Sequence, residues 1–284
     1  MHAPPQAIDL LLTNAGEVAT PIGRQARAGA DLGRIDRIPG GAVAIDQERI
    51  VDVGPAAALA ERYRPRQRFD CQGGLLLPGL IDAHTHAVFA GSREREFELR
   101  NQGASYAEIA RSGGGILATV QRVRAASEEE LTGGLLQRLD RFLEHGTTTI
   151  ECKSGYGLSR EGELKCLRAM AGAARQHPVE LVPTFLGAHA YPPEFAGNRP
   201  AYVDLLCEQL LPEVASAGLA RYADVFTEQI AFSLADSRRI LERARGLGLG
   251  LRLHVEQLSA MGGAELAAEL GAASADHLEH ITPV

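Results

Sequence analysis

Short runs rich in apolar or β-branched residues alternate with longer amphipathic segments from residue 75 onward. These runs predict a buried strand at residues 75–83 and further strands at residues 147–153, 179–187, 223–227, 250–256 and 273–280. The segments between them predict helices at residues 106–112, 116–126, 127–144, 160–176, 202–217, 233–247 and 263–270. Six strands that alternate with helices in this way are typical of parallel βα units.

The first part of the chain has a different pattern, with β-rich runs and turns before any helix. Residues 41–45 and 49–53 flank a polar turn, which predicts a β-hairpin, and residues 19–40 are expected to form a loop. We therefore expect a small β domain at residues 1–73 and an α/β domain at residues 74–284. Its parallel units fit an open sheet or a closed barrel, and the barrel is favoured because no GxGxxG dinucleotide motif follows the first strand.

Histidines gather at the ends of the predicted barrel strands. His84 and His86 stand two residues apart after the first of these strands, so both imidazoles point to one face. His189, His254 and His277 also end predicted strands, and the C-terminal strand ends are where barrel active sites lie. Neutral imidazoles suit a divalent metal ion such as zinc or iron. A chance pair on a surface loop and hydrogen-bonded structural histidines remain open alternatives at this point.

Composition narrows the class of protein. The 284 residues include 29 basic and 36 acidic side chains, and the net charge of −7 disfavours a nucleic-acid partner. A hydrophobic content of 45% supports a packed core rather than disorder. The apolar stretch at residues 8–12 is too short for a signal-peptide core or a membrane span, and the four cysteines form no CxxC pair. We therefore expect a cytoplasmic protein, not bound to membranes, with free buried thiols.

Several motifs carry a family resemblance. Residues 78–86 (PGLIDAHTH) resemble the first-strand signature of the amidohydrolase superfamily. Residues 87–93 (AVFAGSR), 153–158 (KSGYGL), 186–190 (LGAHA) and 254–257 (HVEQ) are similar to the imidazolonepropionases, which open the ring in histidine degradation. The resemblance implies a TIM barrel with a small N-terminal β-sandwich domain. It also implies one zinc or iron ion and metal-dependent hydrolysis of the cyclic amide of 4-imidazolone-5-propanoate to N-formimidoyl-L-glutamate.

The resemblance also implies roles for individual residues. Those similar to the family's metal ligands are His84, His86 and His254. Those similar to its substrate-contacting residues are Arg93, Tyr156, His189 and Gln257. Arginine offers a planar fork for a carboxylate, tyrosine a phenol, and His189 a group that can hold or polarise the ring carbonyl. Gln257 cannot take a proton, so His277 is the expected proton carrier and His189 the second expected catalytic residue. Lys153 is expected to pair with Glu151 rather than to bridge two metal ions.

Two alternatives stay open. One is another deaminase or cyclic amidase of the same superfamily, and the other is an inactive metal-binding fragment. About 210 residues follow the start of the first barrel strand, enough for six units of about 35 residues where a closed barrel needs eight. The aspartate that the superfamily takes from its eighth strand is therefore expected to be absent, as in a C-terminally truncated chain. A small-molecule substrate is expected, and a homodimer is left open.

Overall fold

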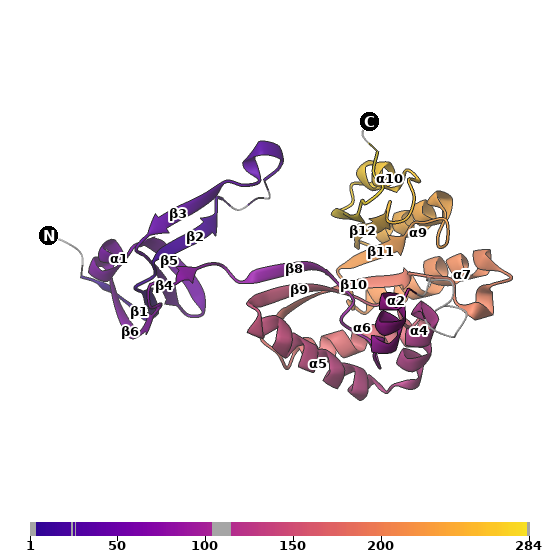
Figure 1. Cartoon of the computed structure of the whole chain (residues 1–284), viewed down its shortest axis with the longest axis horizontal. Coiled ribbons are helices and arrows are strands. Elements are labelled where there is room, and N and C mark those ends of the chain that lie inside the picture. Colours follow the sequence, from indigo (N-terminus) through magenta and orange to yellow (C-terminus); the bar gives the residue numbers. More distant parts are fainter. Residues whose placement is uncertain (1–3, 24, 26, 104–114, 283–284) are drawn as a thin grey trace. The chain divides into compact units, whose positions relative to one another are not determined.

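The computed structural model describes residues 4–23, 25, 27–103 and 115–282 and contains two compact units, Met1–Gly79 and Leu80–Val284 (Figure 1). The helix predicted at residues 106–112 lies outside the described residues. The domain limit predicted after residue 73 stays a prediction, and the boundary between the two units follows Gly79. Each unit is described below by itself.

The N-terminal unit contains two small sheets. The first has the strand order β5-β4-β1-β6, with β5 at Arg49–Pro55, β4 at Gly41–Asp46, β1 at Gln6–Thr13 and β6 at Tyr63–Asp70. The second has the order β3-β2-β7, with β3 at Ile35–Pro39, β2 at Glu17–Pro21 and β7 at Leu75–Leu76. The short helix α1 (Ala56–Arg62) packs on the first sheet through the buried Leu59. Val18 and Val43, one from each sheet, share a buried apolar cluster.

The predicted hairpin is confirmed, because β4 and β5 pair antiparallel with Val43 opposite Val53. Gln47 and Glu48 at its turn both have positive φ angles, 48° and 61°, as the tight turns that match strand twist require. The loop expected at residues 19–40 is wrong in part. β2 and β3 pair antiparallel within this range, and Gly23, Gly29 and Gly33 lie between them.

The second unit is an α/β fold, as predicted. Its six strands form one parallel sheet in the order β13-β12-β11-β10-β9-β8, so each strand pairs with its neighbours in the chain. The strands are β8 (Leu80–Thr85), β9 (Thr147–Lys153), β10 (Glu180–Ala188), β11 (Tyr222–Phe226), β12 (Gly250–Val255) and β13 (Ser274–His277). The helices are α2 (Glu94–Asn101), α4 (Ile116–Ala125), α5 (Glu128–Glu144), α6 (Arg160–Ala174), α7 (Arg199–Leu205), α8 (Leu211–Ser216), α9 (Leu234–Gly246) and α10 (Gly263–Leu270).

Two predicted elements differ from the structure. The single buried strand expected at residues 75–83 is two strands, since β7 pairs with β2 in the first unit and β8 borders the six-stranded sheet. With β9 as its one neighbour in the described sheet, β8 leaves Leu80 and Ile81 52% and 72% exposed. The helix predicted at residues 202–217 contains a π-helical turn at Leu206–Leu210. Pro212 follows this turn and has no N–H for an α-helical bond, which favours such a local distortion.

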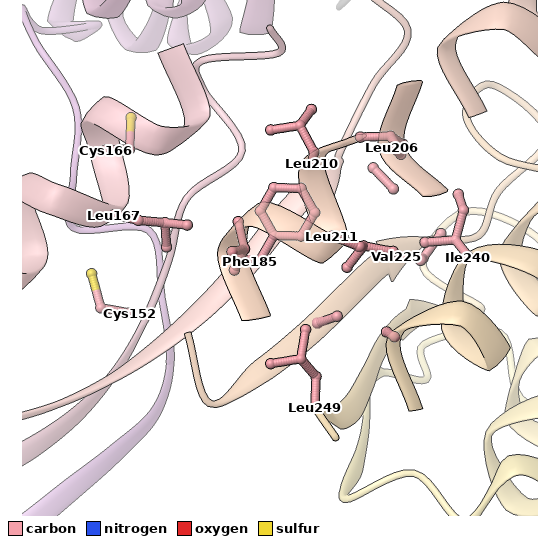
Figure 2. Packing of buried hydrophobic residues seen from close by; sticks show 14 of the residues in the cluster. Cys152, Cys166, Leu167, Phe185, Leu206, Leu210, Leu211, Val225, Ile240 and Leu249 are labelled. Carbon is pink, nitrogen blue, oxygen red and sulfur yellow. The ribbon is translucent and has the colours of Figure 1, made fainter. Parts of the chain in front are cut away.

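The core of this unit lies between the sheet and its helices. Figure 2 shows Phe185 of β10 and Val225 of β11 near Leu210 and Leu211 of the segment that contains the π-helical turn, all members of one buried cluster. Ser127 begins α5 with a capping box, in which its side chain and that of Glu130 each bind the other's backbone N–H. The expected free thiols are present, and three of the four are buried. No helix in the described ranges is long and apolar enough to cross a membrane.

Candidate metal and substrate site

Three imidazoles converge at the C-terminal end of the parallel sheet. His84 lies on β8, His86 directly follows this strand, and His254 lies on β12. Nε2 of His86 is 3.3 Å from Nε2 of His84 and 3.3 Å from Nε2 of His254. The sheet curls enough for a β12 side chain to reach β8, since Arg252 donates to the carbonyl of Ala83 at 2.8 Å. Because side chains alternate between the two faces of a strand, His84 and His86, two residues apart, both point toward the strand that carries His254.

The ring nitrogens of the three histidines are arranged as in a metal site. Nδ1 of His254 is 3.0 Å from the Asp224 carboxylate, and Nδ1 of His84 is 3.1 Å from that of Asp276. A carboxylate that accepts from Nδ1–H leaves the Nε2 lone pair available as a ligand. Two nitrogens bound tetrahedrally to one zinc ion at its usual distance stand about 3.4 Å apart. Burial, reinforced by neighbouring histidines, holds the pKa of His86 well below its ordinary value, so this imidazole stays neutral. The residues present therefore fit a divalent metal ion.

A group of buried charges lies beside these histidines. The Lys153 ammonium is 2.9 Å from Glu151 and 2.8 Å from Asp224, so the expected pairing with Glu151 is present. Burial alone would raise the pKa of Asp224, but His254 and Lys153 hold it well below its ordinary range. Burial also opposes ionisation of Asp276, yet hydrogen bonding to a histidine and the nearby cations lower its pKa to about 2. Both aspartates are therefore ionised near neutral pH.

The KSGYGL segment after β9 folds around a buried carboxylate. Glu163, in the first turn of α6, accepts hydrogen bonds from the backbone N–H groups of Gly155, Gly157 and Leu158 at 2.8 to 3.0 Å. Arg124 donates to the carbonyls of Gly157 and Leu158 from the other side, at 2.7 and 2.8 Å. Burial raises the pKa of Glu163, although these hydrogen bonds oppose the rise. The loop is thus held by a fixed set of polar contacts.

Glycines in this loop permit two close approaches. A Cβ at Gly157 would lie 2.2 Å from the carbonyl carbon of Gly162, so only glycine lets the loop contact α6 here. Gly155 has a φ of +100°, and its carbonyl accepts a hydrogen bond from Nδ1 of His189 at 2.9 Å. Because a carbonyl can only accept, Nε2 of His189 carries the lone pair. Burial lowers the pKa of His189 to about 4, so its ring is neutral near neutral pH.

The expected substrate-contacting residues lie beside the histidines. The ring of His189 stacks on that of His86 with centroids 5.0 Å apart, and the Tyr156 ring is 5.4 Å from His189 and 5.8 Å from His86. Burial raises the pKa of Tyr156, so the phenol keeps its proton. A pocket of about 190 Å³ is lined in part by Arg93, Tyr156, His86 and Phe89. The segment after β8 and the loop after β9 thus both contribute side chains to one small cavity.

The Arg93 guanidinium is engaged within its own segment. Its Nε donates to Glu96 at 2.9 Å, and a second nitrogen of the guanidinium binds the same carboxylate oxygen. The other Glu96 oxygen accepts a hydrogen bond from the N–H of Gly115 at 3.1 Å. The Arg93 guanidinium, which lines the pocket, is therefore paired with the Glu96 carboxylate.

The remaining predicted residues end β12 and β13. The His277 ring lies 5.2 Å from the rings of both His84 and His254, and its Nδ1 is 3.4 Å from Glu279. Gln257 is half-buried in the bend after β12. The carboxylate of Glu256, next to it, accepts hydrogen bonds from the backbone that begins α10.

Sequence reasoning missed the acidic residues that support the site. Asp224 interrupts the apolar run of β11, and Asp276 precedes His277 on β13. A charged residue inside a buried strand needs a partner, so Asp224 was a readable signal. Glu163 carried no such signal, because acidic residues in the first turn of a helix are common.

Comparisons with known proteins agree with this geometry. A family model described as "Imidazolonepropionase-like composite domain, bacteria" matches residues 41–64. The imidazolonepropionase of Symbiobacterium thermophilum is 54% identical over 277 residues, covering 96% of this chain and 65% of that protein. That of Myxococcus xanthus is 52% identical, with 97% and 65% covered. The chain is thus similar to the imidazolonepropionases over nearly its whole length. It spans about 65% of the length of these two imidazolonepropionases.

Solved structures show the fold. A zinc-bound adenosine deaminase from Xanthomonas campestris has a TM-score of 0.57 and 21% identity, covering 95% of this chain and 54% of that chain. A 5-methylcytosine deaminase from Klebsiella pneumoniae has a TM-score of 0.59 and 14% identity, with 92% and 55% covered. These likenesses confirm the predicted α/β barrel type of fold, of which the described residues of this chain contain six parallel strands. The three-histidine set supports a metal cofactor.

Proposed function

We propose that this chain carries the metal-binding and substrate-binding part of an imidazolonepropionase. The reaction is hydrolysis of the cyclic amide of 4-imidazolone-5-propanoate to N-formimidoyl-L-glutamate. The observation that carries the proposal is the convergence of His84, His86 and His254 beside a pocket lined by Arg93 and Tyr156, in a chain similar to the imidazolonepropionases.

The three histidines would hold one divalent cation, zinc or iron, through their Nε2 atoms. Such a cation supplies Lewis acidity for hydrolysis of an amide. Asp224 and Asp276 keep two of the imidazoles in the tautomer that this binding requires, since each accepts from an Nδ1–H group.

The pocket residues suit a small heterocycle with a carboxylate tail. Arg93 would bind the propionate, with the substrate carboxylate replacing Glu96 on its guanidinium. Tyr156 keeps its proton and can donate a hydrogen bond to the substrate. His189 presents a lone pair at Nε2, so we place an N–H group of the ring there rather than the ring carbonyl.

Two residues at the strand ends complete the proposal. His277 lies beside the three-histidine set, where its imidazole can accept a proton and release it to the departing nitrogen. Gln257 lies near the end of the strand that carries His254 and offers an amide for a hydrogen bond to substrate.

The test is turnover by the whole chain loaded with Zn²⁺ or Fe²⁺, followed as the appearance of N-formimidoyl-glutamate. Arg93→Ala should raise KM by about 10-fold or more, since a charge-assisted hydrogen bond contributes about 1.5–3 kcal/mol. Arg160→Ala, which removes a surface pair with Glu213, is the matched control and should leave KM unchanged. Turnover of cytosine in place of imidazolone propionate would favour the deaminase alternative. Metal binding without turnover would favour a metal-binding fragment.

A further inference from the structure

Lysine is rare in this chain, and one of its lysines lies at the centre of the site. The 29 basic residues include two lysines, Lys153 and Lys165, and the remainder are arginines. Lys165 is half-buried and donates to the carbonyls of Arg124 and Ala126. Lys153 has no exposed surface and ends β9 inside the curl of the sheet. Its position calls for an explanation, because a buried ammonium loses several kcal/mol of hydration.

The Lys153 ammonium contacts the carboxylates that orient the metal-site histidines. Its Nζ is 2.8 Å from Oδ2 of Asp224, whose other oxygen binds Nδ1 of His254. The same Nζ is 3.5 Å from Oδ2 of Asp276, which binds Nδ1 of His84. One side chain therefore stands behind two of the three imidazoles, with a single carboxylate between it and each ring.

The charge balance around Lys153 favours a cation nearby. Lys153 and Arg252 face the carboxylates of Glu151, Asp224 and Asp276, which leaves the buried group with a formal charge of −1. The three imidazoles are neutral when they act as ligands. A divalent ion at the histidines would thus be next to a group of opposite net charge.

The same surroundings keep Lys153 out of the ligand set. Burial would lower the pKa of Lys153, but Asp224 and Glu151 together raise it above its ordinary value. An ammonium has no lone pair, so it can neither ligate a metal ion nor add CO₂ to become a bridging carbamate. The residue is left with a positioning role.

We propose that Lys153 is a positioning residue for the metal site, because it fixes the two carboxylates that orient His84 and His254. The inference rests on the metal site proposed above. A lysine suits this role better than an arginine, because its compact ammonium with three donors can serve three carboxylates at once.

The two effects of Lys153 on a bound cation have opposite signs, which makes the test decisive. Through its charge alone, Lys153 repels a cation, so Lys153→Met would tighten Zn²⁺ binding. Through positioning, the same substitution releases both aspartates and weakens binding. Loss of a residue that orients metal ligands typically lowers affinity by 10–100-fold.

The experiment measures Zn²⁺ affinity of the whole chain by competition with a chromophoric chelator. We expect Lys153→Met to weaken binding by about 10-fold or more and Lys165→Met, the matched control, to change it by less than about 2-fold. Unchanged or tighter binding by a folded Lys153→Met variant would overturn the inference while leaving the metal site intact. A wild-type chain that binds no Zn²⁺ would overturn the metal site and the inference together.

A second measurement covers a Lys153→Met variant that does not fold. Selective ¹⁵N-lysine labelling of the wild-type chain gives two side-chain ammonium positions, Lys153 and Lys165. Addition of Zn²⁺ should shift the Lys153 signal and leave the Lys165 signal in place as an internal reference. A Lys153 signal that does not respond to saturating Zn²⁺ would exclude coupling between this ammonium and the histidines.

Discussion

Removal of the Glu163 carboxylate should destabilise the chain in proportion to the N–H groups it leaves without a partner. Glu163→Ala deprives the buried N–H groups of Gly155, Gly157 and Leu158 of their acceptor. Each unsatisfied buried donor costs about 1–3 kcal/mol. Because the loop can partly relax, we expect the free energy of unfolding to fall by roughly 3–5 kcal/mol, toward the lower end of that sum.

The Glu163→Gln variant removes one of the two acceptor oxygens, whereas Glu163→Ala removes both. A glutamine keeps one oxygen for Gly157 and Leu158 but turns an N–H₂ group toward Gly155, so we expect a loss of about 1–3 kcal/mol. Urea unfolding followed by circular dichroism gives these differences. Hydrogen exchange at the three backbone amides should quicken in the same order, alanine before glutamine before wild type.

The matched control for Glu163 is in the same helical turn. Glu161 is exposed, and Glu161→Gln should change the free energy of unfolding by less than about 0.5 kcal/mol. The reasoning would be refuted by Glu163→Ala and Glu163→Gln variants equal in stability to each other or to the Glu161→Gln control.

Three further predictions concern backbone packing, thiols and capping. Gly157→Ala should cost about 1–3 kcal/mol of unfolding free energy, because its Cβ would overlap the α6 backbone, whereas Gly197→Ala, with open space around it, should not. Titration with a thiol reagent should modify Cys71 quickly and the three buried cysteines only after denaturation. Burial protects these thiols from the reagent, and it raises the pKa of Cys152 to about 12. Rapid modification of all four thiols in the native chain would contradict the burial of these three cysteines. Ser127→Ala removes the capping box of α5 and should lower the unfolding free energy by about 1 kcal/mol in urea, which an unchanged midpoint would exclude.

Local pattern was enough to predict the parallel sheet and most of its helices. The strands predicted at residues 147–153 and 250–256 match β9 and β12 closely, because β-branched and apolar residues that follow a glycine favour a strand. The pattern did not predict the exposure of β8, which was expected to be buried but has one neighbour in the described sheet. Exposure of an edge depends on which strands lie beside it, and one strand's own sequence does not contain that information.

The three-histidine set could be predicted from strand periodicity and the family resemblance, but the carboxylates that bind these histidines could not. His84 and His86 share a face at any strand end, whereas their partner Asp276 depends on how far the sheet curls. The paired helices α7 and α8 were predicted as one helix, since a π-helical turn preserves the apolar face that periodicity detects. Long-range register and small backbone irregularities were therefore the parts that remained hidden.

The candidate metal site joins two strands that are not neighbours in the sheet. His84 and His86 come from β8 or its end, and His254 comes from β12, with β9, β10 and β11 between them. A cation bound as proposed would tie β8 to a strand with which it does not pair. Separation of β8 from β12 and escape of the ion would then be one local opening event. The lifetime of the bound metal would report the rate of that opening, and removal of the metal by a chelator would favour it.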